Sequence, residues 1–293
     1  MPNYPLHEGF IAPARRRPQI WRLLLGTVIA FAIYMLGVFA IVGVAWRQLG
    51  AGEVSLETVV AADEPQTLLI LLTTFIGMAV GPMVAVRLLH NRSAASLFGR
   101  APLVLRDFVV ATVAVGGLFS ISVLGWFTLY DALPGMPLAD WLWILPAALL
   151  CVLIQTGAEE VLFRGYFQQQ LAARFATPLV WIVIPSVAFG MVHYNAASAG
   201  TTVWIVVLSA SLFGFIAADL TAHTGSIGAA WGFHFANNVI ALLIIGTQGS
   251  LTGLALFRTP YAISETDVIW PLILVDLAFM LLAWLLVRRL IRR

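Results

Sequence analysis

The sequence has no lysine, only one cysteine and few charged residues of any kind. All 16 basic side chains are arginine, and charged residues make up 10% of the 293 positions, whereas soluble domains carry about a quarter. Cys151 has no second cysteine with which to form a disulfide, and its apolar surroundings indicate a small buried hydrophobic residue. A basic patch interleaved with aromatic residues is also missing, which argues against a nucleic acid partner.

Hydrophobic residues, by contrast, make up 61% of the chain, and the mean hydropathy is +0.95. A soluble chain of this length buries only about three quarters of its surface on folding, too little to hide so many apolar side chains. The lipid bilayer must therefore solvate the rest. Eight segments have the roughly 20 mostly apolar residues that a spanning helix needs: 21–46, 67–89, 107–130, 139–163, 177–195, 200–219, 225–247 and 268–288.

We therefore predict an all-α fold, a polytopic membrane helical bundle of about eight transmembrane helices. Residues 1–20 are expected to form a cytoplasmic tail, and residues 21–293 a single bundle. The first apolar run is too long for the core of a signal peptide, so we interpret it as a retained helix.

The arginines predict the orientation of this bundle. With the N-terminus inside, 14 of the 16 arginines fall in cytoplasmic segments, and only Arg47 and Arg258 lie outside. Cytoplasmic loops of membrane proteins carry such an excess of basic residues. An odd number of spans would place one terminal arginine cluster on the wrong side. We expect both termini in the cytoplasm and an integral protein of a bacterial cytoplasmic membrane.

Polar residues interrupt the apolar spans at three places. Ionisable side chains at membrane depth are costly and mark candidate functional sites. The three clusters are Glu159-Glu160 followed by Arg164, Phe189 followed by His193, and His234 followed by Asn238. Asp276 in the last span is expected to hydrogen-bond to a neighbouring helix, and His223 has no role that we can assign.

The first cluster contains two acids that face different directions. Glu160 and Arg164 are four residues apart on one helix face, in the favourable order for an ion pair. Glu159 is rotated by about 100°, which leaves it without a local partner and available as a general base. The alternative is structural: the three charges form a buried polar knot, and His193, His234 and Asn238 hold helices together by hydrogen bonds.

The function depends on whether the clusters meet. If the fourth helix continues through the amphipathic stretch 168–173 to a turn at 176–178, Glu159 and His193 both lie about 25 Å from that turn. They are then level in the membrane. His234 lies roughly 15 Å into the seventh span and is expected to reach the same cavity.

These motifs resemble those of the CPBP family of intramembrane peptidases, which includes the type II CAAX-prenyl endopeptidases and the bacteriocin-processing or self-immunity (Abi) proteins. The resemblance covers about residues 145–245 and implies a peptidase core there. It also implies that Glu159 activates water with help from His193, and that His234 and Asn238 stabilise the oxyanion. Glu160 and Arg164 would orient the site.

The expected activity is therefore that of an intramembrane endopeptidase that cuts a membrane-associated peptide or protein with glutamate-activated water. We expect no metal, with zinc held by two histidines and a glutamate as the alternative. A proton-coupled transporter and a non-catalytic membrane scaffold are the competing functions. The sequence contains no inverted repeat and no paired interrupted helices of the kind that transporters have.

Overall fold

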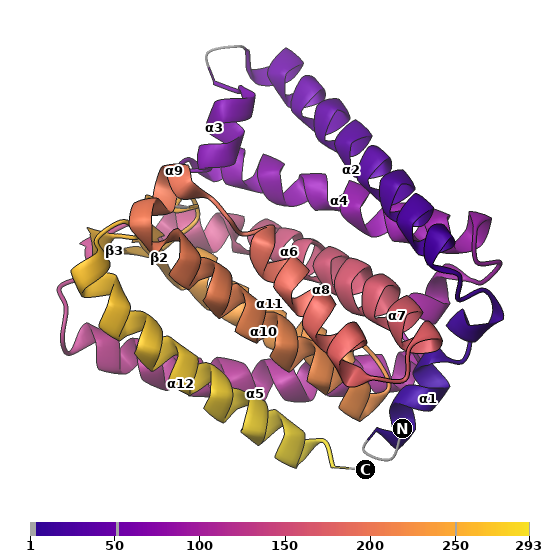
Figure 1. The fold of residues 1–293 in the computed structure, drawn as a ribbon. Coiled ribbons are helices and arrows are strands. Elements are labelled where there is room, and N and C mark those ends of the chain that lie inside the picture. The colour runs from indigo at the N-terminus through magenta and orange to yellow at the C-terminus, as the bar shows by residue number, and fades with distance from the viewer. Residues whose placement is uncertain (1–3, 51–52, 250, 293) are drawn as a thin grey trace.

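The computed structural model describes residues 4–50, 53–249 and 251–292, and these residues form a helical bundle (Figure 1). Among these described residues, six stretches are long and apolar enough to cross a membrane. They are α2 (Ile20–Leu49), α4 (Pro65–Leu88), α5 (Ala101–Phe127), the continuous run of α6 (Leu138–Glu160), η3 (Val161–Gln168) and α7 (Gln169–Arg174), then η5 (Gly200–Thr202) with α10 (Val203–Thr224), and α12 (Thr266–Leu290).

Two shorter apolar helices, Leu179–Met191 and Gly228–Ile244, complete the bundle. The first consists of η4 (Leu179–Val183) and α8 (Ile184–Met191), and the second of α11 (Gly228–Val239) and η6 (Ile240–Ile244). Each of the eight predicted segments therefore contains a helix, and the all-α membrane bundle is confirmed. The fifth and seventh are shorter than predicted.

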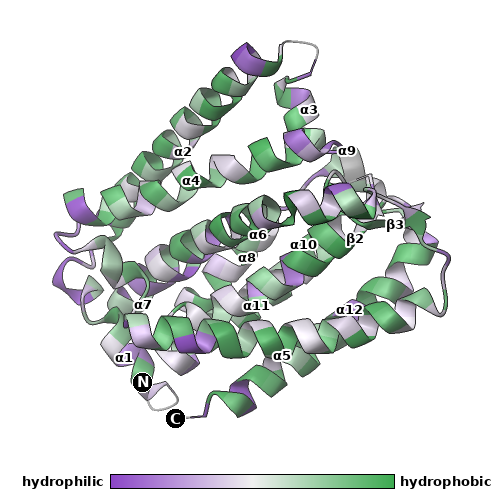
Figure 2. Cartoon of the chain, turned by 180° about the vertical axis from the view of Figure 1, so that it is seen from behind, coloured by the Kyte–Doolittle hydropathy of each residue, from purple (hydrophilic) through white to green (hydrophobic). Residues whose placement is uncertain are grey.

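The helices pack in a definite spatial order across the bundle. α2 packs on α4, α4 on α6, α6 on α11, α11 on α5, and α5 on α12, while α10 fills the centre against α8, α11 and α12. The long helices are hydrophobic over most of their length, and hydrophilic residues gather towards their ends and in the loops (Figure 2). This distribution fits a bundle whose outer surface is solvated by lipid.

The α2–α4 pair lies at one side of the bundle and is held together by close backbone contact. A Cβ at Gly81 would stand 2.7 Å from the Cα of Ala30, and one at Gly77 would stand 3.2 Å from the Cα of Tyr34. A side chain at Gly81 would force the two backbones apart, and one at Gly77 would need its neighbour to shift by a few tenths of an ångström. The Gly77-x-x-x-Gly81 spacing is typical of membrane helices that pack through small residues.

Both ends of the described chain lie at the same end of the bundle (Figure 1). The Tyr4 hydroxyl donates to Asp219 Oδ1 at 2.8 Å, and Arg288 Nη1 donates to the same oxygen at 3.0 Å. An even number of crossings agrees with this arrangement. Residues 1–3 of the expected tail, and Arg293 among the counted arginines, lie outside the described residues.

Part of the expected N-terminal tail is folded against the bundle. α1 (Pro5–Ile11) packs on α10 and α7 and buries His7, Phe10 and Ile11. Two short helices, η1 (Ala14–Arg16) and η2 (Ala94–Leu97), lie near the same end of the bundle and pack against α7 and η3 respectively. The fourth helix continues to Arg174 as expected, but the glutamines at 168, 169 and 170, in the stretch predicted to be amphipathic, are buried.

The opposite end of the bundle carries a small sheet that the sequence analysis did not predict. Its strands are β1 (Leu133–Pro134), β3 (Phe257–Ala262) and β2 (Ile245–Gln248), in that spatial order, with β1 antiparallel and β2 parallel to β3. α3 (Leu56–Ala61) and α9 (Ala196–Ala199) are the short helices at this end (Figure 1).

Candidate active site

The two glutamates end α6, and a π-helix, η3, follows them directly. Glu160 and Arg164 are almost completely buried, and Arg164 Nε lies 3.2 Å from Glu160 Oε2. Arg164 Nη2 also donates to the Gly214 carbonyl on α10 at 3.3 Å. The predicted ion pair is present, and it ties the fourth helix to the centre of the bundle. π-helical turns often occur at functional sites.

His234 lies between the two glutamates. Its Nδ1 is 2.8 Å from Glu160 Oε1, and its Nε2 is 3.6 Å from Glu159 Oε2. Because a carboxylate can only accept, Nδ1 carries the proton in the bond to Glu160. α11 thus brings its histidine to both acids, and Glu160 is held from two sides, by Arg164 and by His234.

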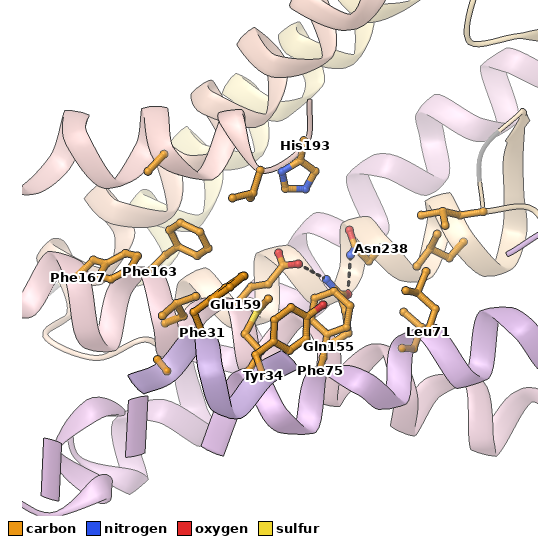
Figure 3. A pocket seen from close by; sticks show the side chains of 18 of the residues that line it. Phe31, Tyr34, Leu71, Phe75, Gln155, Glu159, Phe163, Phe167, His193 and Asn238 are labelled. Carbon is orange, nitrogen blue, oxygen red and sulfur yellow. Dashed lines mark hydrogen bonds between the residues drawn. The ribbon is translucent and has the colours of Figure 1, made fainter. Parts of the chain in front are cut away.

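The expectation that Glu159 has no local partner is wrong. Gln155, one turn earlier on α6, donates from Nε2 to Glu159 Oε1 at 2.9 Å, and Asn238 Nδ2 donates to Gln155 Oε1 at 2.9 Å (Figure 3). Gln155 therefore links the glutamate to the asparagine. Within the described chain, Glu159 Oε2 is buried without a hydrogen-bond partner, so one oxygen of the carboxylate remains available.

His193 follows α8 and is oriented by its own helix. Its Nδ1 lies 2.8 Å from the Phe189 carbonyl, which can only accept, so Nδ1 carries the proton. The neutral ring then has Nε2 as an acceptor. The Phe189 ring packs between functional groups, with its centroid 4.7 Å from the His193 ring and 4.7 Å from Arg164 Cζ. This packing explains the phenylalanine of the second motif.

A cavity of about 650 Å³ joins three of the four predicted catalytic residues. Glu159, His193 and Asn238 line it together with Gln155 (Figure 3). Its other walls are mainly aliphatic and aromatic, and the aromatic side chains come from α2, α4 and η3: Phe31, Tyr34, Phe75, Phe163 and Phe167. Glu159, His193 and Asn238 therefore line one cavity, as predicted. His234 does not line it and instead lines a second, smaller cavity.

The same geometry bears on metal coordination. Among the residues that the structure describes, no group of three or more His, Cys, Asp or Glu side chains is placed to hold a metal ion. His193 Nδ1 faces the Phe189 carbonyl, and His234 Nδ1 is bonded to Glu160. Histidines that bind a metal also donate their second ring N–H to acceptors of this kind.

Sequence analysis missed two parts of the site. Gln155 is four residues before Glu159, so helical spacing alone could have placed both on one face of α6. The aromatic wall from α2 and α4 carried no signal of this kind, because aromatic residues in apolar spans normally face lipid or other helices. Its position depends on how the α2–α4 pair packs against α6.

The fold and the site together define a helical membrane protein with a buried polar centre that opens on an apolar cavity. Residues 141–240 match the family model described as "Type II CAAX prenyl endopeptidase Rce1-like". This segment includes all three polar motifs, and the resemblance to the CPBP peptidases is thereby confirmed for it.

One curated relative is the "Uncharacterized protein YyaK" of Bacillus subtilis (strain 168), which is 36% identical over 114 residues. The matched segment is 39% of this chain and 38% of the relative, so it spans well under half of either protein. No solved structure matches the chain.

Proposed function

We propose that this protein is an intramembrane endopeptidase that hydrolyses peptide bonds of a membrane-associated protein or peptide, with Glu159 as the general base. The observation that carries the proposal is the shared cavity: a buried carboxylate, an imidazole and an amide from three separate helices line one mainly apolar space. An extended apolar peptide fits such walls. The match of residues 141–240 to an Rce1-like model supports the same reaction class.

The attacking water binds between Glu159 and His193. Glu159 Oε2 has no hydrogen-bond partner within the described residues and lies 3.6 Å from His234 Nε2. It accepts one hydrogen of this water, and His193 Nε2 accepts the other. A buried carboxylate oxygen without a partner is costly, so a bound water at this point also satisfies the site. Gln155 fixes the direction of the carboxylate through its 2.9 Å hydrogen bond.

The proposed reaction is an acid–base hydrolysis in two steps. Glu159 takes a proton from the water while the water oxygen bonds to the carbonyl carbon of the scissile peptide bond. This addition produces a tetrahedral oxyanion. Glu159 then gives this proton to the leaving nitrogen as the carbon–nitrogen bond breaks. The products are a carboxyl terminus and an amine, and Glu159 is again a carboxylate.

Asn238 and His234 stabilise the oxyanion in this proposal. Asn238 lines the cavity, and its amide can supply a donor to the developing charge. His234 Nε2 lies 3.6 Å from Glu159 Oε2, and His234 Nδ1 lies 2.8 Å from Glu160 Oε1. In this proposal the imidazole counters negative charge that builds up beside Glu159.

We also propose that this chemistry needs no metal and that the arginine-rich end, where both termini lie, faces the cytoplasm. Activity that survives a strong chelator, with purified protein free of stoichiometric zinc, tests the first statement. Cysteine labelling from either side of sealed vesicles, with a cysteine introduced at exposed Glu57 or near Arg288, tests the second.

The decisive experiment compares the membrane peptidome of cells that carry wild-type protein or Glu159→Gln. Glutamine preserves shape and hydrogen bonding but removes the base, so we expect cleavage products to disappear and the turnover of a purified substrate to fall about 10²–10⁴-fold. Glu57→Gln, at an exposed glutamate on α3, is the matched control. Equal cleavage by Glu159→Gln with equally abundant protein refutes the mechanism and favours a scaffold or transporter.

A further inference from the structure

A second cavity, of about 250 Å³, shares His193 and Asn238 with the large one. We call it the polar chamber. The large cavity is walled by α2, α4, α6 and η3 with parts of α8, α11 and η6, whereas the polar chamber lies where α8, α10, α11 and α12 meet. His193 and Asn238 therefore form part of the partition between an apolar space and a polar one.

Two helices present their lining residues to the chamber with regular helical spacing. On α12 the residues are Ile273, Asp276 and Met280, and on α10 Ser209 and Ala210 lie between Val206 and Phe213. Six of the twelve lining residues are polar. They are His193, Ser209, His234, Asn237, Asn238 and Asp276. So high a polar share inside a membrane bundle calls for a polar occupant.

Asp276 is the least expected member of this lining. It lies within a spanning helix and outside the segment that matches the Rce1-like model. The interhelical hydrogen bond expected for it is not formed with any residue that the structure describes, and it has no ion pair there. An acid at membrane depth is costly to insert and must be solvated by some group. Water is the only small polar molecule available in quantity.

We propose that the polar chamber holds the water that the peptidase consumes, and that Asp276 with Ser209 binds this water. The inference rests on the proposed function. Each cleavage uses one water, and a peptide seated in the large cavity would displace water from its apolar walls. Water held in the polar chamber, on the other side of His193 and Asn238, could replace the water that the peptide displaces. Water occupies about 30 Å³ per molecule in the liquid, so the chamber has room for several.

Two pairs of variants test the chamber through turnover. Asp276→Leu removes a water-binding group from the polar chamber. We expect kcat to fall about tenfold or more with little change in KM, as for a step after substrate binding. Asp276→Asn still binds water and should recover most of the loss. Ala210→Leu fills the chamber and should lower kcat as well, whereas Ala278→Leu, the same change at an exposed position on α12, should not.

A structural role for Asp276 predicts a different result. Because Asp276→Leu removes a half-buried acid from a spanning helix, the variant should unfold at the same or a higher temperature than wild type. A variant that is as stable as wild type but slower separates water supply from folding. Loss of stability together with kcat, in Asp276→Leu and Ala210→Leu alike, overturns the proposal.

Met280 offers a readout that does not depend on activity. It lines the chamber and is only 4% exposed, so hydroxyl radicals generated from water by X-ray pulses should oxidise it only if water lies inside. We expect Met280 oxidation in wild type and much less in Asp276→Leu. If Met280 is not oxidised in the wild-type protein, the proposal that the chamber holds water is refuted, even if Glu159→Gln is inactive. A fully active Glu159→Gln overturns the proposed function itself.

Discussion

Two clusters of buried polar residues lie along the same helix, and they are bonded in different ways. The first, the glutamate cluster, comprises Glu159, Glu160, Arg164, Gln155 and His234. The second, the glutamine cluster, lies two turns later and comprises Gln168, Gln169, Gln170, His90 and Arg92. Members of the glutamate cluster bond mainly to one another and reach a cavity.

Two members of the glutamine cluster, Gln168 and Gln169, also bind backbone carbonyls of other segments. Gln168 donates to the Ala218 carbonyl at 2.9 Å, and Gln169 donates to the carbonyls of Phe10 at 2.6 Å and Ser96 at 2.9 Å. Arg92 in turn donates to Gln169. These side chains hold α10, α1 and η2 against α7. Buried polarity alone therefore does not mark a candidate active site, and what distinguishes the glutamate cluster is that Gln155 and Glu159 line a cavity.

The largest effect on folding is expected from Glu160→Gln. The substitution leaves the Arg164 guanidinium buried without its counter-charge, and removing one partner of a buried ion pair typically costs about 3–5 kcal/mol. Thermal unfolding of the purified protein in detergent measures this loss. Glu159→Gln, one residue earlier, should unfold close to wild type. If the two variants lose equal stability, the division into a structural and a chemical acid is wrong.

Asn238→Ala should affect chemistry more than folding. Removal of an oxyanion donor lowers kcat by about 10²–10³-fold, and the loss of the hydrogen bond to Gln155 costs only about 1 kcal/mol. Steady-state cleavage of the substrate found by peptidomics measures the first effect. Gln48→Ala, at an exposed amide side chain of α2, is the control. Equal losses of kcat in both variants would exclude a special role for Asn238.

Periodicity and motif spacing were enough to place the spans and to bring Glu159 and His193 to one cavity. Both predictions use rules that act along a single helix or across one hairpin. Gln155 was within reach of the same rule, since it is one turn from Glu159. The position of His234 between two acids, rather than at the cavity wall, depends on the rotation of α11 about its own axis, and no local pattern reports that rotation.

The glutamine cluster was misjudged for a related reason. Three consecutive glutamines at a helix end are typical of an exposed amphipathic turn. They are buried here because α1 and η2 fold back over α7. The sheet formed by β1, β2 and β3 was not predicted because its strands are short and β1 lies far from the other two in the sequence. Their pairing depends on the tertiary fold and leaves no local sequence pattern.

Gln169→Leu tests the structural character of the glutamine cluster. It leaves the Phe10 and Ser96 carbonyls and the Arg92 guanidinium without this partner, and a buried unsatisfied group costs about 1–3 kcal/mol. We expect lower thermal stability with unchanged turnover per folded molecule. Gln48→Leu, the same change at an exposed glutamine of α2, should alter neither quantity. A fall in turnover of the folded Gln169→Leu protein would mean that the two clusters are coupled.

The smallest effect concerns pH. Burial lowers the pKa of His90 from 6.5 to about 4, and the nearby Arg92 and Arg22 act in the same direction. Its ring is engaged as a neutral imidazole, with Nδ1 3.0 Å from the Arg17 carbonyl and Nε2 3.1 Å from the Tyr166 hydroxyl.

Between pH 6.5 and 4 the unfolded chain therefore binds a proton at His90 that the folded chain does not. This contribution to stability is complete above pH 6.5 and is lost as the pH falls towards 4. The unfolding temperature should drop between pH 7 and pH 5 in wild type, and drop less in His90→Gln, which cannot take up the proton. Because His90 belongs to the glutamine cluster, the pH profile of turnover per folded molecule should be the same in both proteins. Parallel unfolding curves would show that His90 is not held neutral by the fold, and a shifted turnover profile would show that its charge reaches Glu159.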